Sequence, residues 1–147
     1  MITALETAKY LLTLDDPEDG DLTSNLKLQK LLYYAQGVHL ALHSRPLFGE
    51  RIEAWKHGPV CPPVYGRFKA YASTPIPRPA GFDPSTLPKP ARATVTDVHR
   101  VYGQFSAWRL REMTHNEPPW KSTYRDGAMG LVISHEAMKK YFLTCLR

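Results

Sequence analysis

The chain has 147 residues, a length that fits one compact domain over residues 1–147 with a hydrophobic core of its own. Hydrophobic residues make up 43% and charged residues 22%, which excludes wholesale disorder, and no apolar run is long enough to cross a bilayer. The net charge is +5, and since five of the 14 acidic residues stand in the stretch 15–21, the rest of the chain is strongly basic and favours an acidic partner.

The N-terminal residues predict a helix followed by a solvated turn. Ile2, Leu5 and Leu12 recur at helical spacing, which predicts a helix over residues 2–14. The stretch 15–21 (DDPEDGD) ends it, because proline, glycine and repelling carboxylates favour a turn. This stretch is not an EF-hand loop. Counted from Asp15, the ligand positions three and twelve are occupied by Pro17 and Leu26, which have no side-chain oxygen. With Glu6 so early there is no signal-peptide pattern, so we expect a cytoplasmic protein.

Residues 24–43 predict one central helix around which the chain is organised. Leu26, Tyr33 and Leu40 stand a heptad apart on one side, with Gly37 among them as a place where a neighbour can approach closely. A helix apolar on two sides is either sandwiched in the core or keeps one side for a partner, and exposure of Tyr33 or Leu40 would favour the partner. The other side carries the stripe Leu28, Leu31, Leu32, Ala35, His39 and Leu42.

A short strand is expected around Ile52, where apolar and polar residues partly alternate. Three prolines at 59, 62 and 63 then make a rigid corner with few hydrogen-bond donors, and the last two are suited to begin a helix that runs through Tyr71. The expected buried side of this helix consists of Val64, Phe68 and Tyr71.

Residues 73–92 form a proline-rich connector, with six prolines between positions 73 and 90. Neither half of the chain has much core alone, so we expect this connector to wrap over one domain rather than to separate two. A long helix over residues 95–113 follows, interrupted by the stretch 114–120. Its expected inner side consists of Val98, Val101, Tyr102, Phe105 and Trp108.

The C-terminal part predicts a short strand at residues 131–133 and a last helix at residues 135–146 that Ser134 caps. Its inner side is expected to hold Met138, Tyr141, Phe142 and Cys145. The fold class predicted is therefore mainly α with a small β element: a single compact helical domain around the central helix near residues 24–43.

Candidate catalytic residues are sparse. A metal-dependent hydrolase using His57, His115 and Glu117 is one alternative, but no pair has the spacing of a zinc protease helix, and we expect these groups to hold loops instead. The dispersed glycines form no phosphate-binding loop, and Ser134 beside His135 makes no catalytic pair. We therefore expect no catalytic residue, no metal, no cofactor and no small-molecule substrate. The candidate metal ligands are His57, Cys61, His115, Glu117 and His135. The sequence neither predicts nor excludes a disulfide between Cys61 and Cys145.

A nucleic-acid-binding regulator is the other alternative. Between residues 100 and 125, basic residues bracket aromatic ones, a mixture that suits phosphate contacts and base stacking. No known DNA-binding module is recognisable there. We favour buried aromatics and solvated arginines. The residues concerned are Arg100, Arg109, Arg111, Lys121 and Arg125 with Trp108, Trp120 and Tyr124.

Three ordered stretches resemble the Panacea domain family, also known as a phage-associated domain of unknown function. They are residues 26–36 (LKLQKLLYYAQ), residues 53–65 with EAW, GPV and VY, and residues 114–120 with THNE and PW. The matching residues are expected to divide between fold and interface. They are Lys27, Gln29, Lys30, Tyr33, Tyr34, Trp55, Gly58, Pro59, Val60, Tyr65, His115, Glu117 and Trp120.

The resemblance implies a mainly helical fold and an antitoxin of a toxin–antitoxin system. Such a protein is not an enzyme but neutralises a cognate toxin, encoded by an adjacent gene, through direct protein–protein binding. Some relatives carry an added DNA-binding domain, for which this chain leaves no room. We expect Lys27 and Lys30 to anchor neighbouring loops. Toxin contact is expected on the connector after residue 73 and on the basic helix after residue 95, with Arg100, Arg109 and Arg111 as candidates.

Overall fold

Helices make up most of the protein, and a two-stranded hairpin is the β element, as the sequence predicts. The computed structural model describes residues 1–19 and 22–146. Its elements are α1 (Ala4–Thr13), η1 (Pro17–Asp19), α2 (Asn25–His43), β1 (Glu53–Trp55), β2 (Gly58–Val60), α3 (Pro62–Phe68), η2 (Lys69–Tyr71), η3 (Pro84–Thr86), α4 (Lys89–Tyr102), α5 (Ala107–His115), α6 (Pro118–Lys121) and α7 (His135–Cys145).

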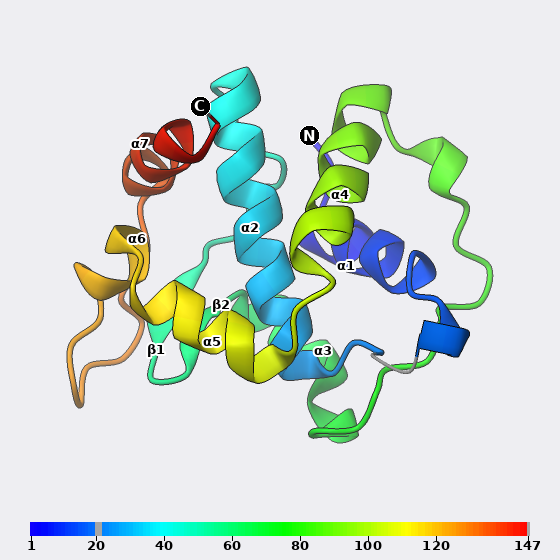
Figure 1. The fold of residues 1–147 in the computed structure, drawn as a ribbon, viewed down its shortest axis with the longest axis horizontal. Coiled ribbons are helices and arrows are strands. Elements are labelled where there is room, and N and C mark those ends of the chain that lie inside the picture. The colour runs from blue at the N-terminus through cyan, green and yellow to red at the C-terminus, as the bar shows by residue number, and fades with distance from the viewer. Residues whose placement is uncertain (20–21, 147) are drawn as a thin grey trace.

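Helix α2 runs through the middle of the molecule, with α1 and α4 on one side, α7 on the other and α5 across its lower part (Figure 1). Ser24 caps it by accepting a hydrogen bond from the Lys27 backbone N–H at 3.3 Å. Fifteen of its 19 residues are buried, so α2 is a sandwiched element. Tyr33 is 0% and Leu40 4% exposed, which makes the second apolar side of α2 core. The predicted stripe is also buried, except that Leu42 is exposed.

Helix α7 packs against α2 at Gly37, where the Phe142 ring lies so close that a Cβ atom would overlap it. The ring also meets Tyr33 and Tyr34 edge-on, with centroids 5.5 and 5.8 Å apart. The expected role of Gly37 is therefore confirmed. Met138 and Phe142 are buried as predicted, but Cys145 is exposed, because α7 ends at the surface. Cys61 and Cys145 are both free, so the disulfide left open by the sequence is not formed.

The hairpin pairs β1 with β2 in antiparallel register, Glu53 opposite Val60 and Trp55 opposite Gly58. The strand expected around Ile52 begins one residue later, and the sequence did not predict β2, because Pro59 cannot donate to a ladder. Residues 131–133 lie beside the hairpin but form an isolated bridge, Val132 opposite Glu53, rather than the predicted strand; the Ile133 N–H donates to the Ile52 carbonyl at 2.8 Å.

The single helix predicted over residues 95–113 is wrong: two helices, α4 and α5, cover this region. Helix α4 already begins at Lys89, because prolines are tolerated in a first helical turn, and so residues 89–92 are not connector. Ser106 restarts the chain as the N-cap of α5, accepting from the Arg109 N–H at 3.1 Å. The break turns predicted core residues outward. Val101 and Trp108 are exposed, as is Tyr71 at the end of η2.

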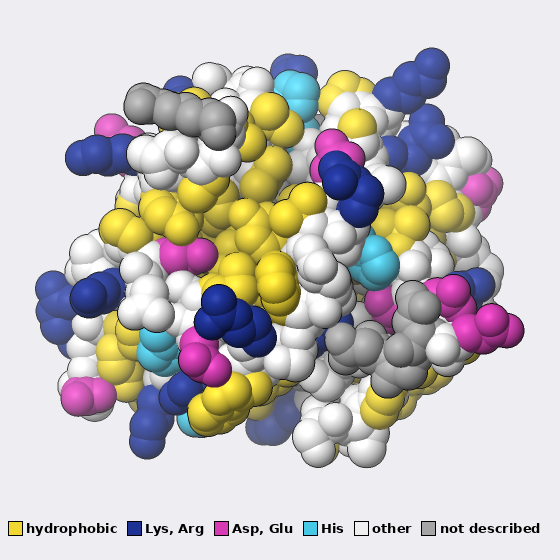
Figure 2. Space-filling view, viewed as in Figure 1, with side chains coloured by type: hydrophobic (Ala, Val, Ile, Leu, Met, Phe, Trp, Pro, Cys, Tyr) yellow, Lys and Arg dark blue, Asp and Glu magenta, His cyan; other side chains and the backbone are white. Residues whose placement is uncertain are grey.

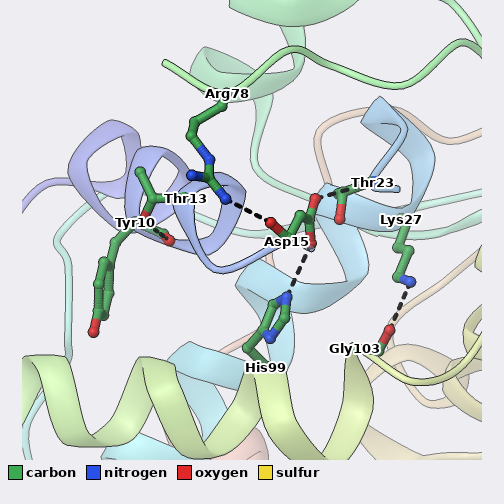
Figure 3. A network of polar contacts seen from close by, with 8 residues as sticks. All are labelled: Tyr10, Thr13, Asp15, Thr23, Lys27, Arg78, His99 and Gly103. Carbon is green, nitrogen blue, oxygen red and sulfur yellow. Dashed lines mark hydrogen bonds and ion pairs between the residues drawn. The ribbon is translucent and has the colours of Figure 1, made fainter. Parts of the chain in front are cut away.

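The remaining connector lies against the domain, as predicted. Ile76 and Leu87 are buried, and the Ile76 N–H donates to the Thr23 carbonyl at 2.9 Å. Figure 3 shows Asp15 where four segments meet, so Asp15 is not simply part of a solvated turn. Its carboxylate lies 2.9 Å from His99 Nε2 and accepts from the Thr23 N–H at 3.2 Å, and its carbonyl accepts from Arg78 at 2.8 Å. The predicted turn also includes residues 20–21, which lie outside the described residues.

Within the described residues, no helix combines the length and the apolar character needed to span a membrane.

Replacing Gly37 by Ala is expected to destabilise the protein, because the new methyl group overlaps the Phe142 ring. We expect the free energy of unfolding to fall by about 1–3 kcal/mol in urea denaturation. Gly66→Ala is the matched control, since no atom lies within 4 Å of a Cβ there, and Gly66 also stands in a helix. The control should shift stability by no more than about 1 kcal/mol, in the stabilising direction. Equal effects at both positions would contradict the packing described.

Candidate functional site

Polar side chains of α2 bind backbone groups of the surrounding loops. Lys27 Nζ donates to the Gly103 carbonyl, between α4 and α5, at 2.7 Å (Figure 3). Lys30 Nζ donates to the Pro59 carbonyl of β2 at 3.3 Å. Lys27 therefore anchors a loop, as expected, whereas Lys30 anchors strand β2 of the hairpin. Lys30 is fully buried, and burial followed by the charge of Arg111 lowers the pKa of Lys30 to about 7.

Amide side chains of α2 hold two further segments. Gln29 Oε1 accepts from the Cys61 N–H at 2.9 Å, and Asn25 Nδ2 donates to the Tyr65 carbonyl at 3.1 Å. Gln36 bridges both backbone groups around Phe48, accepting from the Leu47 N–H at 2.7 Å and donating to the Phe48 carbonyl at 2.8 Å. Sequence reasoning missed Asn25 and Gln36 as anchors. The signal was present, because an amide within a helix buried on all sides needs an internal partner.

Glu117 joins the region before α6 to α2. Its two carboxylate oxygens accept hydrogen bonds from Tyr33 and Tyr34, each at 2.9 Å. Burial raises the pKa of Glu117, and hydrogen bonds from Tyr34, Tyr33 and Tyr141 oppose that rise. Burial, and then the nearby Glu117 charge, raise the pKa of both tyrosines, which stay protonated donors. Tyr34 also stacks on Tyr102 at 3.9 Å between centroids. This carboxylate therefore binds the C-terminal third of the chain to the centre.

His115 and Trp120 hold the hairpin. His115 Nε2 lies 2.9 Å from the Lys56 carbonyl, and its Nδ1 lies 2.7 Å from the Arg111 carbonyl. Trp120 Nε1 donates to the Trp55 carbonyl at 2.7 Å. These contacts join the motif residues into one hydrogen-bonded scaffold around α2 and the hairpin.

The weighed metal ligands are not brought together. His57 and His135 are exposed, whereas Glu117 is buried against tyrosines, and burial raises the pKa of the Cys61 thiol to about 12. Across residues 1–19 and 22–146, no three His, Cys, Asp or Glu side chains gather closely enough to hold a metal ion. Ser134 caps α7, accepting from the Ala137 N–H at 3.1 Å.

A groove opens between the hairpin, the start of α2 and α3. It has a volume of about 350 Å³ and a mostly apolar lining, with Trp55 and Tyr65 as aromatic walls. The two rings meet edge-on with centroids 5.0 Å apart. Lys56, His57 and Lys69, all exposed, stand at its edge.

The candidate basic residues of α4 and α5 are exposed or half-buried, and one of them, Arg111, contacts the edge of the groove. Arg100 is exposed and lies 3.4 Å from Asp97, while Arg109 is exposed on α5. Arg111 stands over the Trp108 ring, 4.8 Å from its centroid, and donates to His57 Nδ1 at 3.3 Å. The aromatics expected in the core divide: Trp120 is buried and stacks on Tyr124, but Trp108 is 62% exposed.

An apolar patch lies over the C-terminal half of α2, away from the groove at its start. Figure 2 shows hydrophobic side chains gathered over α2 between α7 and α4. The residues that line a shallow hollow there include Val38, Leu42, Val101, Tyr102 and Leu146.

Replacing Lys30 by Met is expected to remove a pH dependence of stability. The pKa of Lys30 is about 7 in the folded protein and 10.5 ordinarily, so the unfolded chain binds more protons between these values. The free energy of unfolding should rise with pH across that window, with a Lys30 contribution approaching about 1.4 kcal/mol per pH unit. Urea denaturation from pH 6.5 to 9.5 would measure it. The exposed Lys89, changed to Met, serves as control, and parallel curves for wild type and Lys30→Met would refute the assignment.

Replacing Tyr34 by Phe should cost about 1–3 kcal/mol of unfolding free energy, because one oxygen of buried Glu117 loses its donor. The stacking on Tyr102 is retained in this variant. Tyr124→Phe removes a phenol bonded to Asp126 at an exposed site and should cost less than about 0.5 kcal/mol. Chemical denaturation of both variants measures the difference, which must vanish if the Glu117 network contributes nothing.

Comparison with known proteins follows the same residues. A model of the Antitoxin SocA-like, Panacea domain family matches residues 28–121, a range that contains nearly all of the three resembling stretches and more than half of the chain. Antitoxin SocA from Caulobacter vibrioides (strain NA1000 / CB15N) is 57% identical over 47 residues. That match covers 32% of this chain and 25% of the Caulobacter protein, so the chain matches about a quarter of that relative. No solved structure shows significant similarity to the chain. The chain belongs to the Antitoxin SocA-like, Panacea domain family.

Proposed function

We propose that this protein is an antitoxin that neutralises a cognate toxin by direct protein–protein binding. Family membership supports an antitoxin role. The binding mechanism is supported by a separation between core and surface. Most of the motif side chains contact one another in the core, while the surface carries an apolar patch and a Trp108–Arg111 pair. Tryptophan and arginine are the residues that most often dominate the energy of protein interfaces.

The contacts of the candidate catalytic residues give a metal-dependent hydrolase no support. His57 Nδ1 accepts from Arg111, both ring nitrogens of His115 face carbonyl oxygens, and both oxygens of Glu117 accept from tyrosines. These groups act as structural hydrogen-bonding partners, so we propose a protein without enzymatic activity.

We place the toxin in the cytoplasm with this protein and expect an adjacent gene to encode it. Arg100, Arg109 and Arg111 remain proposed partner contacts; Arg111 is the one of the three that stands beside the groove. Nucleic acid is a less favoured partner. The exposed Trp108 beside arginines would suit base stacking and phosphate contacts with a nucleic acid.

Co-expression tests the proposal. The reading frames on either side of the gene are induced singly in a bacterial host, and growth is measured with and without this protein. We expect one neighbour to arrest growth, this protein to restore it, and a tagged copy to purify with that neighbour as one complex. If no neighbour inhibits growth, or if an inhibitor is neither relieved nor bound, the proposed function is wrong.

A further inference from the structure

The groove beside the hairpin is built rigidly. Trp55 Nε1 donates to Glu53 Oε1 at 3.0 Å, which fixes the ring that forms one wall. The polar groups of its floor satisfy one another, since Gln29 Nε2 donates to Asn25 Oδ1 at 2.9 Å. The lining therefore offers apolar surface of fixed shape, and its volume of about 350 Å³ accommodates one large side chain.

The edge of the groove is positively charged. Lys56 and Lys69 are exposed there, and Arg111 reaches it through His57. The nearest carboxylate on β1, Glu53, is 6% exposed and already bonded to Arg51 at 2.6 Å. Among the described residues, no Asp or Glu lines the groove, so its positive charge is not balanced locally.

A second hollow extends this charge. It has a volume of about 370 Å³, and its lining includes residues of α3 and η2, two elements that also contribute to the groove. Lys9, Arg67 and Arg78 line it, and within the described part of the chain no acidic residue does. Basic side chains of α3 and η2, together with Lys56, Lys9 and Arg78, therefore line the two hollows.

From this complementarity we propose that the groove is a docking site for an acidic peptide segment of the partner that carries one aromatic side chain. The aromatic side chain packs against the edge-to-face Trp55–Tyr65 pair, and the flanking carboxylates meet Lys56 and Lys69. The proposal rests on the proposed function, because the toxin is the protein that would present this segment. It also assigns Trp55 and Tyr65, two of the matching residues expected to divide between fold and interface, to toxin contact.

A titration followed by NMR tests the site without any toxin. The probe is a short synthetic peptide of Asp, Glu and Ser with one central Trp, added to the isotope-labelled full chain. We expect saturable shifts at Trp55, Lys56, Tyr65 and Lys69, with a Kd below about 1 mM. A peptide with Ala in place of Trp should bind at least about 5-fold more weakly, because the stacking contribution is lost. A peptide with Lys in place of the acids should not bind.

Charge reversal provides the matched variants. Lys56→Glu with Lys69→Glu should weaken binding of the acidic peptide at least about 10-fold. Lys89→Glu with Lys140→Glu, at exposed positions outside the groove, makes the same change in net charge and should alter the Kd less than about 2-fold. Absence of saturable shifts up to about 2 mM peptide, shifts centred elsewhere, or equal effects of both double variants would overturn the proposal. Tighter binding of a single-stranded oligonucleotide of equal charge at these residues would reassign the groove to nucleic acid.

The same variants separate the two proposals. If wild type rescues growth and the Lys56→Glu, Lys69→Glu variant rescues equally well, the docking site is wrong while the antitoxin function stands. If wild type fails to rescue, the function is wrong and the peptide titration still decides what the groove binds.

Discussion

Burial of most of α2 is the constraint on which the rest of this structure depends. A helix in that position can carry polar side chains only if each finds a partner inside the protein, because an unpaired buried polar group costs more than its hydrogen bond contributes. Here each partner lies in a different segment: Gly103 for Lys27, Pro59 for Lys30, Phe48 for Gln36 and Glu117 for the two tyrosines. The hairpin, the loops and α5 to α6 are therefore positioned by one set of requirements.

The sequence predicted the elements whose signals are local. Apolar periodicity predicted α1, α2 and α7 closely, helped by the Ser134 cap of α7. Gly37 indicated that a neighbouring element approaches α2 closely. The errors have non-local causes. Apolar periodicity continues from α4 into α5, so the break before Ser106 and the outward turn of Trp108 could not be read from it. The pairing of β2 depends on β1 across a turn, and Pro59 hides it. The groove was invisible, because Leu26, Trp55 and Tyr65 come together only in the fold.

The separation between scaffold and surface has a bearing on partner choice. Most of the motif side chains are held in the core by hydrogen bonds, whereas Lys56, Lys69, Arg109 and Trp108 have large exposed areas. Changes at such positions leave the core contacts intact, so one scaffold can present different charges and anchors to different partners. This physical independence is in keeping with the proposed antitoxin function.

The Glu117 bridge also has a consequence for the order in which the chain can mature. Tyr33 and Tyr34 lie 84 and 83 residues before the carboxylate that satisfies them, and Trp120 follows the Trp55 carbonyl by 65. During synthesis the central helix therefore emerges long before the C-terminal residues that cover it. The centre of the molecule can therefore close only after the segment that carries Glu117 and Trp120 has been made. Synthesis of that segment, rather than formation of α2 alone, supplies the partners that the buried phenols of α2 require.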